Sequence, residues 1–395
     1  MYRKFTADHI FNGYGLLPGQ TVLIADATGV IIDMVDQEDS GDGVEVFKGM
    51  LTPAFVNAHC HLELSHLKGF VPEKTGLVDF VQQVMGRRAA SEELKLDAMG
   101  NAEVEMYNCG IIAVGDICNT ADSIPVKQQS RLLWHNFIEV SGFADALAEK
   151  RFMQMKTVYD QFQSANQGHT ASFSPHAPYS VSKKLFQLLN NETANEIITI
   201  HNQECEAEDD LYKYKGGGFL ELYKNFGIDI KGFEATGKSS FRSWLPYFTG
   251  GQSIISVHNT FTGADDVTFS QRLLQHVNIP FYYCLCVNAN KYIERANPPV
   301  DLLRKLNCDL IIGTDSYASN RQLNILEEIK TIQQESDYSI PLAEILQWAT
   351  INGATALRLQ YNIGSFETGK KPGIVLIENL DNLQTTPAST ARRIL

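Results

Sequence analysis

Eight apolar runs rich in β-branched residues recur along the chain, and several of them end in a single polar residue. Three clear examples are residues 197–201, 254–258 and 310–315, which end in His201, His258 and Asp315. Uninterrupted apolar runs of this length are typical of parallel strands that are covered on both faces. Eight such strands with polar ends predict a (β/α)8 barrel, in which an active site is assembled at the carboxyl ends of the strands.

The order of the predicted elements supports this α/β architecture. Helical spacing of apolar residues separates several of the strands, and no sequence repeat indicates a solenoid. The predicted strands are residues 51–57, 111–116, 132–140, 171–174, 197–201, 254–258, 281–286 and 310–315. The predicted helices are residues 94–107, 184–190, 265–276 and 300–306.

The two chain ends have a different pattern. Short strand-like runs separated by Asp, Gly and Ser turns occupy residues 21–48, and residues 371–379 offer one more. A barrel needs about 250 residues, which leaves part of the 395 residues for a second unit. We expect a composite β-sandwich domain from residues 1–50 and 368–395, and a barrel from residues 51–367.

His59 and His61 form an H-x-H motif at the end of the first predicted barrel strand. Residues i and i+2 of a strand point to the same face, so both imidazoles can share one cation. Such triplets also occur on solvated loops, where they are two surface histidines. His201, His258 and Asp315 at the ends of later strands favour the metal site.

Charge and composition exclude several classes of partner. The net charge is −13 and no block of Lys and Arg stands out, so nucleic acid is not expected. No run matches a signal peptide or a membrane span, which predicts a cytoplasmic protein that does not bind membranes. Seven cysteines without a CxxC pair are expected to be reduced thiols.

Five ordered motifs resemble the amidohydrolase superfamily, in the branch that contains cytosine, guanine and S-adenosylhomocysteine deaminases, aminodeoxyfutalosine deaminase-like enzymes and triazine hydrolases. The resemblance covers nearly the whole chain. It rests on Pro53-Ala-Phe-Val-Asn-Ala-His-Cys-His-Leu-Glu63, Ser174-Pro-His-Ala-Pro-Tyr-Ser-Val-Ser182, His201-Asn-Gln-Glu204, Val257-His-Asn-Thr260 and Gly313-Thr-Asp-Ser-Tyr-Ala-Ser-Asn320.

The resemblance implies a metal-dependent hydrolase with one divalent ion. The implied metal ligands are His59, His61, His201 and Asp315, a set suited to Zn²⁺, with Fe²⁺ as the alternative. The implied catalytic residues are Glu204 as proton shuttle, His258, and Asp315 again. The bridging carboxylated lysine of binuclear relatives has no counterpart after residues 171–174, so one ion is expected.

Substrate-binding residues are expected around this centre. The resemblance implies contacts from His176 and from Asn290, in a segment that departs from the Cys-Pro-x-Ser-Asn of many relatives. Glu63 either binds substrate or anchors its loop. Tyr179, Trp244 and Phe70 are candidate stacking surfaces for a purine. Residues 202–252 form the longest connection and are interpreted as a lid, or as a surface excursion packed by its own aromatics.

The implied activity is hydrolytic deamination of a purine-type heterocycle or nucleoside, for instance an adenosine derivative with a 5′ substituent such as aminodeoxyfutalosine, S-adenosylhomocysteine or methylthioadenosine. The alternative is hydrolysis of a triazine substituent or of a cyclic amide such as imidazolonepropionate. Glu204 favours the deaminase, because a nitrogen leaving group needs a proton. A non-catalytic scaffold would require lost ligands, and none is lost. Relatives are commonly dimers, so a homodimer is expected.

Overall fold

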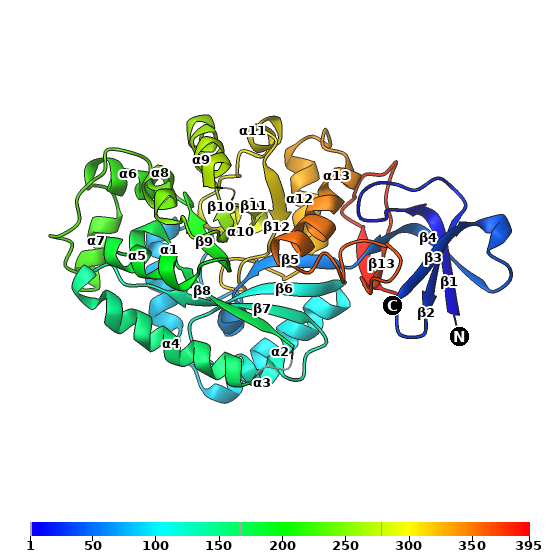
Figure 1. Ribbon diagram of the computed structural model, residues 1–395, viewed down its shortest axis with the longest axis horizontal. Coiled ribbons are helices and arrows are strands. Elements are labelled where there is room, and N and C mark those ends of the chain that lie inside the picture. The colour runs from blue at the N-terminus through cyan, green and yellow to red at the C-terminus, as the bar shows by residue number, and fades with distance from the viewer. Residues whose placement is uncertain (1, 166–167, 278) are drawn as a thin grey trace.

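The computed structural model describes residues 2–165, 168–277 and 279–395 and contains a barrel of eight parallel strands flanked by a smaller sheet (Figure 1). Each barrel strand is almost completely buried, as expected of a parallel sheet covered by helices. The barrel strands are β5 (Phe55–Cys60), β6 (Ile111–Cys118), β7 (Leu133–Val140), β8 (Thr170–Pro175), β9 (Ile197–Asn202), β10 (Ser253–His258), β11 (Phe281–Leu285) and β12 (Asp309–Ile312).

Backbone hydrogen bonds close the two four-stranded sheets into one barrel. At one seam the amides of Thr314 and Asp315 both donate to the carbonyl of His59 at 3.1 Å. At the other the amide of His201 donates to the carbonyl of His176 at 2.9 Å. Gly313 permits the first seam, since a Cβ there would lie 2.8 Å from the Cβ of His59.

All eight predicted barrel strands are present, and the largest shift of a boundary is at the start of the first. Residues 51–53 belong to β4 (Val44–Pro53) of the smaller sheet, and the first barrel strand begins only at Phe55. Ala54 separates the two, and its amide donates to the carbonyl of Pro372 at 3.1 Å. His59 therefore lies within β5 and not beyond its end, whereas His61 follows it.

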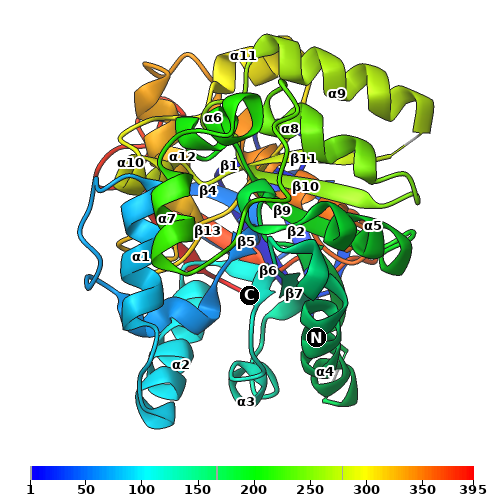
Figure 2. The same cartoon turned by 90° about the vertical axis from the view of Figure 1, so that its left-hand side faces the viewer.

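Helices surround the strands (Figure 2), and the four predicted helices correspond to α2, α5, α9 and α11. The helices are α1 (Leu77–Arg87), α2 (Glu92–Asn108), α3 (Ile124–Lys127), α4 (Ala148–Ser164), α5 (Lys183–Glu192), α6 (Glu206–Tyr214), α7 (Phe219–Asn225), α8 (Ser240–Trp244), α9 (Ala264–Val277), α10 (Val287–Ile293), α11 (Val300–Lys305), α12 (Ile325–Glu335), α13 (Leu342–Gln347) and α14 (Gly353–Ala356).

Both chain ends contribute to the smaller sheet, as the sequence indicates. Its order is β14-β13-β4-β1-β2-β3, and β13 pairs antiparallel with β4. Its remaining strands are β1 (Tyr2–Ile10), β2 (Thr21–Asp26), β3 (Ile31–Asp36), β13 (Ile374–Glu378) and β14 (Thr390–Arg393). Phe5, Leu51, Phe366 and Leu376 share one buried cluster there. The division at residues 50 and 368 stays a prediction.

Two expectations about the chain as a whole can be compared with the structure. All seven cysteines are free thiols. Within the described ranges, no helix has both the length and the apolar character that crossing a bilayer requires.

Candidate active site

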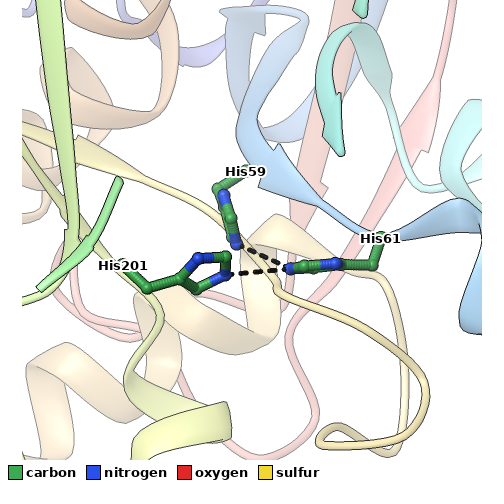
Figure 3. A group of neighbouring side chains, drawn as sticks. All are labelled: His59, His61 and His201. Carbon is green, nitrogen blue, oxygen red and sulfur yellow. Dashed lines mark hydrogen bonds between the residues drawn. The ribbon is translucent and has the colours of Figure 1, made fainter. Parts of the chain in front are cut away.

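The three imidazoles of His59, His61 and His201 (Figure 3) converge with the carboxylate of Asp315 at the carboxyl ends of the barrel strands. The Nε2 atom of His61 lies 3.1 Å from Nε2 of His59 and 3.1 Å from Nε2 of His201. Oδ1 of Asp315 lies 3.2 Å from Nε2 of His61 and 3.7 Å from Nε2 of His59. The sequence places these four residues up to 256 positions apart, and the barrel brings them to one point.

The spacing of these atoms fits one shared ion. Bonds of about 2.0–2.1 Å from one ion to nitrogen and oxygen put neighbouring ligand atoms about 3 Å apart. His201 Nδ1 donates to the carbonyl of His176 at 2.8 Å, so the Nε2 of the neutral ring carries a lone pair. Lone pairs this close to one another are stabilised by a shared cation. The four residues therefore form a candidate metal site.

Electrostatics favours the protonation states that a cation needs. Burial lowers the pKa of His61 to about 4 and lowers the pKa of His59 and His201 below the ordinary value. All three rings are therefore neutral at pH 7. Burial acts to raise the pKa of Asp315, but the hydrogen bond with His59 and the neighbouring imidazoles outweigh it and hold the pKa below its usual range.

Two of the site residues have left-handed backbone conformations. The φ angles are 71° at His258 and 57° at Asp315, a region that non-glycine residues rarely adopt. Such conformations cost about 1–3 kcal/mol each and persist where the surroundings impose them. His258 is the last residue of β10 and Asp315 lies three residues beyond β12, so both of these conformations occur at the carboxyl ends of buried strands.

Glu204 and His258 lie next to the four candidate ligands. Nε2 of His258 is 3.6 Å from Oε1 of Glu204, and both side chains are buried. Burial raises the pKa of Glu204 well above its ordinary value, and the nearby charge of Asp315 adds to the effect. Nδ1 of His258 contacts Oδ1 of Asn290 at 2.8 Å, which fixes the orientation of the ring.

These groups open into a cavity of about 270 Å³. One wall is apolar and comes mainly from α1, which the sequence analysis did not predict. The other wall is polar. The lining residues are His61, Leu64, Leu77, Phe80, Val81, Val84, Met85, Arg88, Asn119, Glu139, Ser141, Met155, His176, Tyr179, His201, Glu204, His258, Asp315 and Ser316.

Three of the residues considered for substrate contacts, Trp244, Asn290 and Glu63, do not line this cavity. Trp244 is completely buried among Phe241 and Phe248, because α8 directs it toward the barrel core. Asn290 is also completely buried and reaches the cavity only through His258. Glu63 is the anchor of a loop.

Four hydrogen bonds define the role of Glu63. Its carboxylate accepts from the amides of Asn119 and Thr120 at 3.2 and 3.0 Å, and from the hydroxyl of Thr120 at 3.1 Å. Arg88 Nη2 donates to it at 3.1 Å. Its oxygens are thus engaged by the protein. Phe70, a further stacking candidate, is 65% exposed and does not line the cavity either.

His176 and Tyr179 do line the cavity. The ring of Tyr179 stacks on Phe219 of α7 with centroids 4.2 Å apart, and its backbone carbonyl accepts from the hydroxyl of Tyr223. Residues 202–252 contain α6, α7 and α8, and several of their aromatic side chains are buried. That this segment acts as a lid stays a prediction.

The sequence analysis missed a polar chain on one wall of the cavity. Arg88 Nη2 donates to Oδ1 of Asn119 at 2.7 Å, and Nδ2 of Asn119 donates to Oε2 of Glu139 at 2.6 Å. Glu139 is the penultimate residue of β7, the position that His201 has in β9. If polar residues near the end of every predicted strand had been taken as candidates, Glu139 would have been among them.

Comparisons with known proteins agree with this geometry. The chain is 26% identical over 393 residues to a 5′-deoxyadenosine deaminase of Methanobrevibacter smithii. The matched region covers 95% of this chain and 83% of the relative. The structure of Helicobacter pylori aminofutalosine deaminase in complex with methylthio-coformycin superposes with a TM-score of 0.81 at 22% identity, over 97% of this chain and 93% of that one.

A zinc-bound adenosine deaminase from Xanthomonas campestris superposes with a TM-score of 0.70 at 22% identity, over 98% of this chain and 86% of that one. At these identities the two structures establish the (β/α)8 fold. The model of the amidohydrolase family matches residues 50–393, which is most of the sequence. The chain therefore belongs to the amidohydrolase family.

Proposed function

We propose that the protein is a zinc-dependent hydrolytic deaminase of adenine nucleosides. The observation that carries the proposal is the convergence of three imidazoles and a carboxylate beside Glu204 and His258, at the base of a cavity with one apolar wall. The names of the relatives, which are deaminases of adenosine derivatives, support the same reaction. His59, His61, His201 and Asp315 would hold a single ion.

A divalent cation at this position supplies Lewis-acid activation of water, which makes a nucleophile at neutral pH. Glu204 accepts a proton from the attacking water and passes it to the departing nitrogen, so that ammonia leaves as a neutral molecule. His258 donates or accepts a hydrogen bond at the oxygen that adds to the ring carbon, and Asn290 holds its ring in place. Asp315 stays ionised beside the histidines.

The shape of the cavity supports a substrate with a flat apolar part. Phe80, Val84 and Met85 of α1 line the same cavity as the polar residues, a combination that suits a substrate with an aromatic base and hydroxyls. Tyr179, stacked on Phe219, offers a rigid aromatic surface at the same place. We propose contacts from His176 and Tyr179 to the nucleoside.

Ammonia release tests this proposal. The purified protein, loaded with one equivalent of Zn²⁺, is incubated with adenosine, 5′-deoxyadenosine, 5′-methylthioadenosine, adenine, cytosine and a chlorotriazine. We expect ammonia from the nucleosides and zinc bound at one ion per chain. Turnover of the chlorotriazine or of free pyrimidines alone would refute the nucleoside assignment and favour the triazine or cyclic-amide hydrolase.

Glu204 is the feature that favours loss of a nitrogen leaving group over loss of chloride. Chloride leaves without protonation, whereas an amine or ammonia requires a proton at the leaving nitrogen. The buried carboxyl beside His258 meets that need. A homodimer and a cytoplasmic location stay predictions from the sequence.

A further inference from the structure

One carboxylate in the cavity has hydrogen-bonding capacity that the protein leaves unused. The side chain of Glu139 is 93% buried, and it lines the cavity. Its Oε2 accepts from Asn119, but its buried Oε1 accepts no hydrogen bond from any residue in the described part of the chain. A buried carboxylate oxygen without a donor costs several kcal/mol, so this oxygen is suited to a donor on a ligand.

A neighbouring imidazole presents a second acceptor. The hydroxyl of Ser180 donates to the carbonyl of Ala177 at 3.0 Å, and a hydroxyl has only one proton. We therefore assign Nδ1 of His176 as the donor in its 2.6 Å contact with Ser180, which leaves Nε2 as an acceptor. Ligand atoms of Glu139 and His176 lie within 4.8 Å of each other.

We propose that Glu139 and His176 form a subsite for two adjacent hydroxyl groups, and that Glu139 makes the protein select ribonucleosides. This inference rests on the proposed deaminase function and names the sugar that its substrate carries. Two adjacent hydroxyls on one ring bring two donors to two neighbouring acceptors. A charged acceptor makes such hydrogen bonds strong, which suits it to specificity.

Other occupants fit the surroundings less well. An ammonium group at Glu139 would approach the guanidinium of Arg88, which bonds to the opposite end of Asn119. A second metal ion would need a lone pair on Nδ1 of His201, but that atom donates to the carbonyl of His176 at 2.8 Å. The same hydrogen bond shows that Glu139, 3.8 Å from Nδ1, is not the acceptor that orients His201.

The network behind Glu139 keeps its carboxylate in place. Asn119 is held from the other side by Arg88, which is held in turn by Glu63. Glu63 is bound to two backbone amides of the loop after β6. The polar chain thus fixes Glu139 on a rigid support, as a selective contact requires.

The test measures kcat/KM for ammonia release from 5′-deoxyadenosine and from its 2′-deoxy and 3′-deoxy counterparts. For the wild type we expect the ribonucleoside to be favoured by about 10- to 100-fold, the value of one or two hydrogen bonds to a charged group. Glu139→Ala should reduce that preference to less than about threefold. Glu139→Asp, which shortens the reach by one methylene, should give an intermediate ratio.

Glu208→Gln is the matched control, because Glu208 is a completely buried carboxylate outside the cavity that accepts from Gln203 and Ser240. It should change the rates for all substrates by one common factor and leave the ratio unchanged. A wild type that does not discriminate, or an unchanged ratio in Glu139→Ala, would overturn the subsite while the deaminase function stands. Loss of a second bound zinc in Glu139→Ala would also overturn it. No ammonia from any nucleoside would overturn both proposals.

Discussion

Replacing Lys127 by Met should weaken both the fold and the metal site, although Lys127 lies outside the cavity. Its ammonium bonds to Oδ2 of Asp116 at 2.5 Å, and both side chains are almost completely buried. The other carboxylate oxygen, Oδ1, accepts from the amide of Leu62 at 2.8 Å. Leu62 follows His61, so the ion pair supports the turn that positions a candidate ligand.

The expected magnitude follows from the burial of the pair. Met has nearly the same length and shape as the Lys side chain, so the substitution removes the charge without leaving a large cavity. The carboxylate of Asp116 then stays buried without its counterion, which costs about 3–5 kcal/mol. Because the turn after His61 loses its support, we also expect zinc affinity to fall by about tenfold or more.

Urea unfolding of the metal-free protein, followed by circular dichroism, measures the first effect, and competition with a chelator measures the second. Lys184→Met is the control, because the Lys184–Glu149 pair is exposed and its loss should leave the unfolding midpoint almost unchanged. Adding Asp116→Asn to Lys127→Met should restore part of the stability. Equal unfolding midpoints for Lys127→Met and the control would refute the reasoning.

Three further predictions concern the site and the pH dependence. Glu204→Gln should keep one zinc per chain but lower kcat by about 10²- to 10⁴-fold in the ammonia assay; wild-type turnover would exclude Glu204 as the proton shuttle. His59→Ala should abolish zinc binding, measured by elemental analysis after gel filtration, and a full complement of zinc would contradict its role as a ligand. Burial lowers the pKa of His135 to about 3. As the pH falls from about 6.5 toward 3, the unfolded chain therefore binds a proton at this residue that the folded protein does not, and the free energy of unfolding decreases. In urea titrations, His135→Asn should show a shallower loss of stability over that pH range, by up to about 1.4 kcal/mol per pH unit, than the wild type; parallel curves would contradict this.

The barrel could be predicted because buried parallel strands leave a strong signal in the sequence. Every residue of β9 and β10 is buried, so both read as continuous apolar runs. β1 gave no such signal, since its exposed and buried residues alternate irregularly and polar residues occupy much of it. The boundary near residue 53 was missed because Thr52 and Pro53 were interpreted as part of one strand from Leu51 to Asn57, whereas pairing with β13 places residues 50–53 in β4.

The candidate metal ligands could be predicted for a related reason. A parallel barrel brings the carboxyl ends of all its strands to one rim, so position in the chain almost determines position in space. The substrate wall follows no such rule. Whether Trp244 faces the cavity or the core depends on the rotation of α8 about its axis, and a helix of five residues has too few positions to reveal that rotation in sequence. Aromatic character alone was therefore misleading.

The search for polar residues near the ends of barrel strands, which identified the candidate metal ligands, would also identify Glu139, the residue proposed to select the substrate. Glu139 lies one residue before the end of the strand Leu133–Val140. When the whole strand is interpreted as buried, this carboxylate is treated as part of an apolar run. A carboxylate in that position is costly unless the protein or a ligand satisfies it. Asn119 satisfies one oxygen only. A buried acid near the end of a barrel strand is thus itself a signal, because a substrate that supplied the missing donor would recover the stability that the acid costs the barrel.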